Sequence, residues 1–369
     1  NRVEHYQRIR EAHFDLVLPS YRNDDEQQLM MLDHCQATGL RGVVNVKRLA
    51  PPVAEGPPPS NWKELVQAAV HRFSQHPALY GYMVRDEPSA QAFPQLGRVT
   101  REFEKLDAEH KTCVNLFPIY ASEEQLGTDT YESYLEQYLK TVKPPALCYD
   151  HYPFMLHTED RQDFFQNLEL ARASCLKHDT PLWIVVLSNW WQHFRTPTDA
   201  ELRWQTYGAL TYGVKGIAYF TYWPVKEDYA AVVDYSGSPQ PLYHSIKKLN
   251  AELSVLGRKL ATMKSVAVFH FGKDIPIGCH RLPEDSWLGV TGDPPLAIGL
   301  FHNNAGDKFV LVTNRNTKQV ETAALQFPAS VTRVSMADST TGEFHHLELR
   351  DHTCQIKLPA GTGVLLSVK

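Results

Sequence analysis

The 369-residue sequence predicts a (β/α)8 barrel of the TIM type followed by an all-β C-terminal sandwich. Up to about residue 260, apolar and β-branched runs alternate with amphipathic helical stretches, which is the pattern of parallel βαβ units. Beyond that point, short apolar runs are separated by polar turns, which is typical of antiparallel sheets. We therefore predict a catalytic barrel at residues 1–263 and an accessory β-sandwich at residues 264–369.

The barrel part contains seven strand-like runs. In chain order they are Phe14–Tyr21, Gly42–Lys47, Leu79–Arg85, Thr112–Pro118, Ala146–Tyr152, Leu182–Ser188 and Gly216–Trp223. The helical patterns around them are Arg2–Ala12, Asp25–Thr38, Asn61–Gln75, Gln91–Glu109, Tyr131–Val142, Gln162–His178, Asp199–Tyr212 and Leu242–Met263. A closed barrel of this type has eight strands. We therefore expect that a first strand precedes residue 1 or has been removed or replaced, which makes Leu79–Arg85 the fourth strand and Leu182–Ser188 the seventh.

An open doubly wound sheet is disfavoured, because no glycine-rich phosphate loop follows an early strand. The strand-like runs expected in the C-terminal part are Val266–Phe271, Leu296–Phe301, Phe309–Thr313, Val331–Ser335, Cys354–Leu358 and Gly363–Val368.

Composition excludes several classes of function. The net charge of −5 and the lack of a basic cluster argue against a nucleic-acid partner, and no apolar run approaches the length of a membrane span. The six cysteines form no CxxC pair, and the 17 histidines show no HExxH spacing, so we expect reduced thiols and no metal. The chain opens on Asn1 without a signal sequence, and we expect a processed protein of extracellular or periplasmic location.

The stretch Leu79–Pro88 ends an apolar run in two adjacent carboxylates, Asp86 and Glu87. Folding alone does not favour two like charges at the end of a buried strand, because they repel each other and lose hydration. Such groups are enriched at functional sites. The alternative is structural, with Asp86 and Ser89 capping the helix that follows.

The carboxyl ends of the strands in such a barrel meet on one face, where the active site lies. Those ends carry polar and aromatic side chains, which suit a sugar because rings stack on its apolar surfaces. The expected catalytic residues are Glu87, Asp150 and Asp86. The expected substrate-binding residues are Tyr21, Asn45, Arg85, Asn115, Tyr149, His151, Tyr152, Asn189, Trp190, Tyr222 and Trp223.

Cleavage of a glycosidic bond needs a carboxylic acid that protonates the leaving oxygen, and usually a second carboxylate. Glu87 is the candidate acid, because repulsion from Asp86 would raise its pKa and keep it protonated. Asp150 is the first candidate for the second carboxylate and Asp86 is the next. The structural alternative for Asp150 is a helix cap or an ion pair.

Residues 1–260 resemble a glycoside hydrolase of the clan A superfamily, a (β/α)8 group that includes the family 42 β-galactosidases. The resemblance rests on Arg85-Asp86-Glu87-Pro88, which matches the Asn-Glu-Pro motif of that group except that Asp86 replaces the asparagine. It implies that Glu87 is the acid/base at the end of the fourth strand. The segment Gly216–Trp223 resembles the eighth strand, where an aromatic residue stacks beneath the sugar, and the C-terminal sandwich resembles an accessory domain of these enzymes.

The clan A pattern also implies a nucleophilic glutamate at the end of the seventh strand, where this sequence has Ser188-Asn189-Trp190-Trp191. Three explanations stay open. Asp150 or Asp86 replaces the glutamate, for example as the base of an inverting enzyme. The substrate supplies its own acetamido nucleophile, as in hexosaminidases and chitinases, and Asp86 orients it. The third explanation is that the protein binds sugar without cleaving it. The loop acids Glu227 and Asp234 are further candidates, although both are more typical of solvated loops.

The sequence therefore predicts hydrolysis of an O-glycosidic bond in an oligo- or polysaccharide, without a cofactor. Two rival functions are an inactive carbohydrate-binding protein and a polysaccharide lyase. A lyase would use Tyr149 or His151 as a base, with Arg85 binding an acidic sugar.

Overall fold

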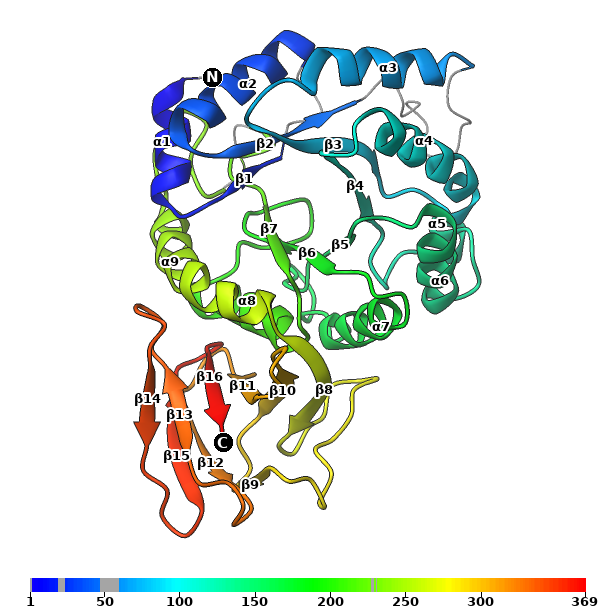
Figure 1. The fold of residues 1–369 in the computed structure, drawn as a ribbon. Coiled ribbons are helices and arrows are strands. Elements are labelled where there is room, and N and C mark those ends of the chain that lie inside the picture. The colour runs from blue at the N-terminus through cyan, green and yellow to red at the C-terminus, as the bar shows by residue number, and fades with distance from the viewer. Residues whose placement is uncertain (1, 19–23, 47–59, 227–228, 230) are drawn as a thin grey trace. The chain divides into compact units, whose positions relative to one another are not determined.

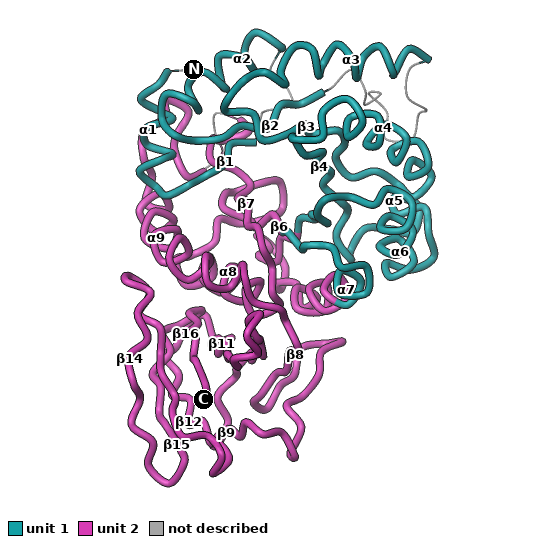
Figure 2. The backbone as a smooth tube through the Cα atoms, in the orientation of Figure 1, with its two compact units in different colours: residues 1–150, 173–183 teal, residues 151–172, 184–369 magenta. Residues whose placement is uncertain are grey.

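The computed structural model describes residues 2–18, 24–46, 60–226, 229 and 231–369 (Figure 1). The chain forms two compact units, residues 1–150 with 173–183 and residues 151–172 with 184–369 (Figure 2).

The N-terminal two thirds of the chain supply seven strands that are hydrogen-bonded in sequence order. They are β1 (Leu16–Val17), β2 (Arg41–Asn45), β3 (Leu79–Asp86), β4 (Lys111–Leu116), β5 (Leu147–His151), β6 (Leu182–Leu187) and β7 (Gly216–Phe220). The pairs from β1 to β5 are parallel. Each predicted run overlaps one of these strands, so the predicted barrel-type sheet is confirmed.

Helices connect these strands. They are α1 (Val3–Glu11), α2 (Asp25–Thr38), α3 (Trp62–Phe73), α4 (Phe93–Leu106), α5 (Glu123–Leu126), α6 (Tyr131–Val142), α7 (Phe164–Lys177), α8 (Asp199–Thr211) and α9 (Pro241–Ala261). In the first unit, α3 and α4 lie outside β2 and β3 (Figure 1). Only the single-turn α5 was not predicted.

The helix ends follow local chemistry. Helix α2 begins with a capping box, in which the Asp24 side chain accepts from the Gln27 N–H and the Gln27 side chain accepts from the Asp24 N–H. It ends at Gly39, whose φ of 71° is the left-handed conformation that favours glycine. Helix α8 begins with a second capping box, between Thr198 and Glu201.

The second unit also contains the C-terminal antiparallel strands. They are β8 (Lys264–Phe271), β9 (Gly289–Thr291), β10 (Leu296–His302), β11 (Lys308–Asn314), β12 (Glu321–Gln326), β13 (Val334–Ala337), β14 (Phe344–Leu347), β15 (Thr353–Leu358) and β16 (Gly363–Val368). Six strands form one sheet in the order β14-β13-β16-β11-β10-β8, and three form another in the order β15-β12-β9.

Both sheets contribute to one apolar core. Val310, Val312 and Leu366 come from the first sheet, and Leu325 and Ile356 come from the second. All six predicted runs overlap a strand, so the predicted all-β C-terminal part is confirmed. The strands β9, β12 and β14 were not predicted.

Helix α8 packs on the larger antiparallel sheet within the second unit. The Thr211 hydroxyl lies 2.8 Å from the Thr313 hydroxyl, and both side chains are fully buried. Gly299 faces the Thr211 carbonyl oxygen, where a Cβ would lie only 2.3 Å away. This contact therefore needs a glycine on β10.

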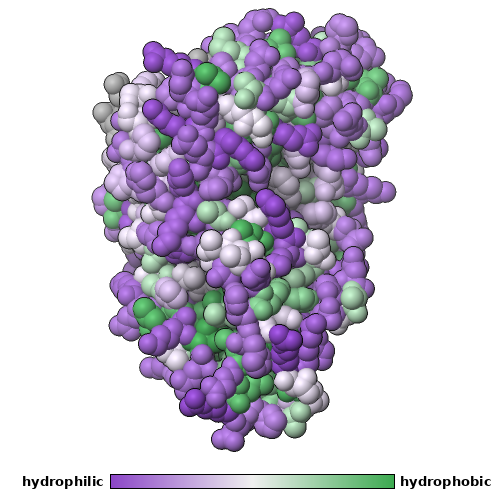
Figure 3. Space-filling model, turned by 60° about the vertical axis from the view of Figure 1, so that its left-hand side comes forward, coloured by the Kyte–Doolittle hydropathy of each residue, from purple (hydrophilic) through white to green (hydrophobic). Residues whose placement is uncertain are grey.

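Hydrophilic residues dominate the face drawn in Figure 3, and the hydrophobic ones form small scattered groups. Within the described ranges, no helix is both long and apolar enough to cross a membrane.

We expect Gly81→Ala to destabilise the protein strongly, because a Cβ on this β3 glycine would lie 1.9 Å from the Lys111 carbonyl oxygen on β4. The expected loss of unfolding free energy exceeds about 3 kcal/mol. Gly257→Ala is the matched control, since no atom lies within 4 Å of a Cβ there. This helical substitution should stabilise by about 0.5–1 kcal/mol. Denaturant unfolding of both variants checks the pair, and equal midpoints would contradict the close approach of β3 and β4.

Candidate active site

Three acids and one amide meet at the carboxyl ends of β3, β4 and β5 in the first unit. The Asn115 amide nitrogen donates to Asp86 Oδ1 at 3.1 Å and to Asp150 Oδ1 at 2.8 Å. The backbone carbonyl of Asn115 also accepts the Glu87 N–H at 2.8 Å. Asn115 therefore contacts all three predicted catalytic residues.

The local register of β3 brings Asp86 to this cluster. Tyr82 lies on the helix side of the strand, because its hydroxyl donates to Asp107 at the end of α4 at 2.6 Å. Strict alternation would place Asp86 on the same side as Tyr82. The pairing of β3 with β4 shifts between Met83 and Arg85, which resets the alternation and lets Asp86 reach Asn115.

Asp86 does not cap a helix. The N-cap of the following 3-10 turn, Ala90–Ala92, is Ser89, and it makes no side-chain capping bond. Helix α4 begins after Ala92, also without a side-chain cap. The structural alternative for Asp86 is therefore not realised, and this carboxylate accepts from Asn115 instead.

Glu87 is held in an unusual backbone conformation with φ of 43°, in the left-handed region that costs a non-glycine residue energy. Its carboxyl pKa is raised to about 8. Burial is the largest cause, the Asp150 charge is the next and the Asp86 charge is the third. Repulsion by Asp86 was expected to raise this pKa, but burial and Asp150 contribute more.

A tyrosine on α6 holds the segment that follows Glu87 by hydrogen bonds. The Tyr134 hydroxyl donates to the Pro88 carbonyl at 2.7 Å and accepts the Phe117 N–H at 3.4 Å. It thereby joins the segments that follow β3 and β4. Sequence reasoning missed this residue, because Tyr131, Tyr134 and Tyr138 have the spacing of an ordinary helical core stripe.

Tyr149 and His151 alternate with Asp150 on β5 and do not join the acids. Tyr149 is fully buried, and its nearest charged or polar neighbours include Tyr131 of α6 and Cys175 of α7. His151 is also fully buried, and its Nε2 lies 3.0 Å from Asp163 Oδ1. Burial lowers the His151 pKa. Both side chains are buried, and their expected contact with the substrate stays a prediction.

The remaining predicted residues of the first unit are Asn45, Arg85 and Tyr21. Asn45 ends β2, where the Gln28 side chain bonds both its N–H and its carbonyl group. The Asn45 amide nitrogen is buried and has no hydrogen-bond partner among the residues described. Arg85 is half-buried, and burial lowers its pKa. Tyr21 lies outside the described residues.

In the second unit, the ends of β6 and β7 carry an aromatic group. The Trp190 and Tyr229 rings contact each other at a tilt of 33° with centres 4.9 Å apart, and Tyr152 stacks on Phe220 at 5.3 Å. The Tyr222 and Trp223 rings meet at 4.9 Å. Sequence reasoning did not include Tyr229, which lies in the loop after β7.

Asn189 stands where the clan A pattern expects a nucleophilic glutamate. It is fully buried and its amide nitrogen donates to Thr221 Oγ1 at 3.3 Å. The Asn189 Oδ1 atom and the Trp190 indole nitrogen have no hydrogen-bond partner within the described part of the chain.

Of the two loop acids, Asp234 is among the described residues. It accepts from the Ser236 hydroxyl at 2.6 Å and from the N–H groups of Ser236 and Ser238 at 2.9 Å, and these bonds lower its pKa. It is thus a turn-forming acid. Glu227 lies outside the described residues. Across residues 2–18, 24–46, 60–226, 229 and 231–369, no three His, Cys, Asp or Glu side chains are arranged to hold a metal ion.

Comparison with known proteins shows which fold this chain shares. No family model and no curated protein matches the sequence. A glycoside hydrolase family 5 structure from Bacteroides vulgatus is similar over 99% of this chain and 84% of its own, at TM-score 0.64 and 10% identity. A family 42 β-galactosidase from G. stearothermophilus is similar over 99% and 95%, at TM-score 0.61 and 9% identity.

A β-galactosidase from the psychrophilic Marinomonas ef1 is similar over 71% of this chain, at TM-score 0.52 and 12% identity. The match covers 59% of that enzyme, which is less than two thirds of its length. The chain shares the fold of these proteins. The expected barrel with a C-terminal β domain is therefore confirmed, and membership of one family is not decided at such identities.

We expect the stability of the protein to fall as the pH rises from about 4.5 to about 8, and Glu87→Gln to remove that fall. The folded state holds the Glu87 proton more tightly than the unfolded state, because the folded pKa is raised from 4.5 to about 8. Stability from this group is therefore complete below pH 4.5 and is lost as the pH passes through 8.

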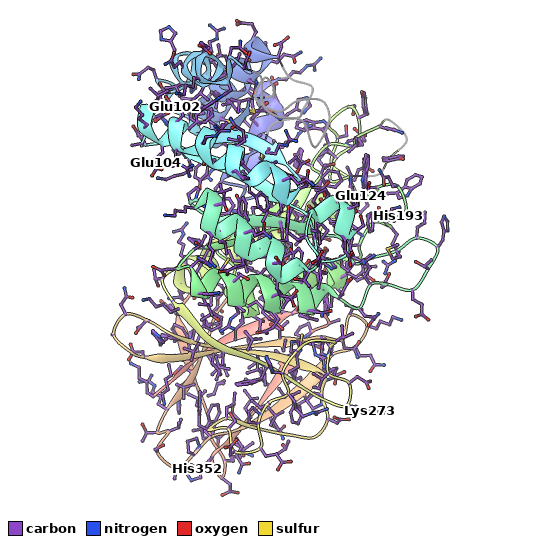
Figure 4. The ribbon with its side chains drawn as sticks, turned by 90° about the vertical axis from the view of Figure 1, so that its right-hand side faces the viewer. Glu102, Glu104, Glu124, His193, Lys273 and His352 are labelled. Atoms are coloured by element: carbon purple, nitrogen blue, oxygen red, sulfur yellow. The ribbon has the colours of Figure 1, made fainter. Side chains whose placement is uncertain are left out.

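Denaturant unfolding at pH 4, 6 and 9 measures this effect. The variant should be more stable than wild type at pH 9 by a few kcal/mol, since one pKa unit corresponds to about 1.4 kcal/mol. Glu124→Gln is the control, because Glu124 is exposed on α5 (Figure 4). Parallel pH profiles for the wild type and Glu87→Gln would show that Glu87 is not buried among anions.

Proposed function

We propose that this protein is a glycoside hydrolase that cleaves an O-glycosidic bond in an oligo- or polysaccharide, with Glu87 as general acid. The proposal rests on the protonation state of Glu87. A carboxyl with a pKa raised to about 8 holds its proton at neutral pH and can donate it to a leaving oxygen. The shared fold with glycoside hydrolases of families 5 and 42 supports this reaction class.

Asp150 is the proposed second carboxylate. It is buried, with 4% of its surface exposed, and its charge acts on Glu87 more strongly than that of Asp86. The hydrogen bond from Asn115 stabilises its anionic form. Asp86 is exposed and is the second candidate. Trp190, Tyr152, Tyr222 and Trp223 belong to the second unit, and sugar stacking on them stays a prediction from the sequence.

One observation favours a second function, the binding of sugar without turnover. The position of the clan A nucleophile holds Asn189, whose amide is committed to Thr221. A lyase is not favoured, since the charges of Asp86 and Asp150 at the ends of β3 and β5 would repel the uronate that a lyase binds. His151, one of its expected bases, is buried against Asp163.

We expect Glu87→Gln to lower kcat about 10²–10⁴-fold on substrates with a sugar leaving group. The loss should be much smaller on aryl glycosides with acidic phenols, because a stable phenolate departs without a proton. A screen of aryl glycosides and of plant and algal polysaccharides identifies the substrate, and kcat is then compared across leaving groups. Wild-type turnover of Glu87→Gln on every cleaved substrate would remove Glu87 from the mechanism, and Glu124→Gln serves as the control.

Asp150→Asn should lower turnover at least about 10³-fold, and azide should restore part of it on an activated aryl glycoside. A small anion can enter the space of the lost carboxylate and attack the sugar carbon, which yields a glycosyl azide. Product analysis by NMR detects it. An inactive variant that azide does not rescue would assign Asp150 to orientation of the substrate. Asp86→Asn, treated in the same way, is the matched control.

A further inference from the structure

We propose that Asn115 is a positioning residue that holds Asp86 and Asp150 as anions, so that Glu87 keeps the proton shared among the three acids. The catalytic meaning of this inference rests on the proposed function, whereas the protonation pattern itself does not. Sequence reasoning expected Asn115 to bind a sugar hydroxyl. The structure shows its amide engaged with two carboxylates instead.

The inference depends on the hydrogen bonds that the Asn115 side-chain amide can donate. An asparagine side chain has two N–H donors, and both are directed at carboxylates, at 3.1 Å for Asp86 and 2.8 Å for Asp150. The orientation of the amide is chemically determined, because its oxygen would repel two anions. That oxygen instead faces the Cys148 thiol at 3.9 Å. The Asn115 side chain thus has no N–H left to donate to a ligand.

The two bonds select which acid is protonated. Hydrogen bonds to an ionised carboxylate stabilise the anion, and both aspartates receive one from Asn115. The influences on Glu87 are burial, the Asp150 charge and the Asp86 charge, all of which favour its neutral form. Three close acids cannot all ionise at low cost. The proton therefore stays on Glu87, the acid that the amide side chain does not contact.

The other titratable groups around Glu87 do not reverse this order. Tyr134 of α6 lies beneath it, and its phenol stays neutral because burial raises its pKa. Burial also raises the pKa of the Cys148 thiol on β5, to well above neutral. Arg85 precedes Asp86 on β3 and is the positive group nearest in sequence. None of these groups distinguishes Glu87 from Asp150 in the way that the Asn115 amide does.

The test measures protonation without a substrate. Carboxyl carbons of Glu and Asp are labelled with ¹³C in separate samples, and the Glu87 signal is identified by its loss in Glu87→Gln. In wild type, Glu87 should titrate well above the range of the other glutamates, and no aspartate should titrate near it. In Asn115→Leu, which keeps the size of the side chain but removes both donors, the Glu87 midpoint should fall by at least one pH unit.

In the same variant an aspartate signal should acquire a midpoint raised by a similar amount, because the proton moves to a carboxylate that has lost its donor. Cys148→Ala is the matched control, since it changes the other side of the Asn115 amide and leaves both N–H donors in place. Its titration should equal that of the wild type. An unchanged Glu87 midpoint in a folded Asn115→Leu protein would overturn the proposal.

Asn115→Asp provides an independent arm if the leucine variant does not fold. The new carboxyl at position 115 can replace the amide donor only when it is protonated. We therefore expect one additional aspartate signal with a midpoint above pH 7. An additional signal that titrates like a surface aspartate would overturn the proposal as well.

Activity separates this inference from the proposed function. With a cleaved glycoside, the alkaline limb of kcat/KM should move to lower pH in Asn115→Leu by the same interval as the Glu87 midpoint. If the carboxyl ¹³C titrations shift as expected but the protein cleaves no glycoside, the Asn115 inference is supported and hydrolysis is rejected. If the wild type cleaves a glycoside but the alkaline limb of its kcat/KM profile does not move in Asn115→Leu, hydrolysis is supported and the Asn115 inference is rejected.

Discussion

The crowding of Asp86, Glu87 and Asp150 at one end of a parallel sheet is the constraint on which the site depends. Glu87 and Asp150 lose hydration there, whereas Asp86 stays exposed, and each charge raises the cost of the next. Two features lower this cost. The Asn115 amide, on the strand between β3 and β5, donates to both aspartates, and Glu87 keeps its proton. The strained φ of Glu87 occurs in the same turn, where its N–H bonds to the Asn115 carbonyl.

The parallel strands were predictable because their signal is local. A buried strand in such a sheet is a mainly apolar run, and all seven runs are rich in apolar residues. The strand β14 was not predictable in this way, because its residues Phe344–Leu347 are half-buried or exposed and include two histidines. Strand β9 has three residues, too few to show a period.

The strand ends could be predicted to carry the site, and Asp86, Glu87, Asn115 and Asp150 do come together. The face that each side chain takes could not be predicted. Tyr149 lies one residue from Asp150 and therefore on the opposite face. In β3 the simple alternation fails, because the register shift before Arg85 is a property of pairing with β4 and leaves no mark in the sequence.

The place of Asp150, the proposed second carboxylate, differs from the clan A pattern that the sequence resembles, in which acid/base and nucleophile stand on the fourth and seventh strands. Here Asp150 is two strands from Glu87, and the bonded oxygens of Asp86 and Asp150 share one nitrogen donor. Two anions fixed so close together favour positive charge beside them. A sugar that loses its leaving group develops such charge at the anomeric carbon. In the proposed hydrolysis this stabilisation is common to the inverting and the acetamido-assisted routes, so the proposed role of the anion pair is the same whichever nucleophile attacks.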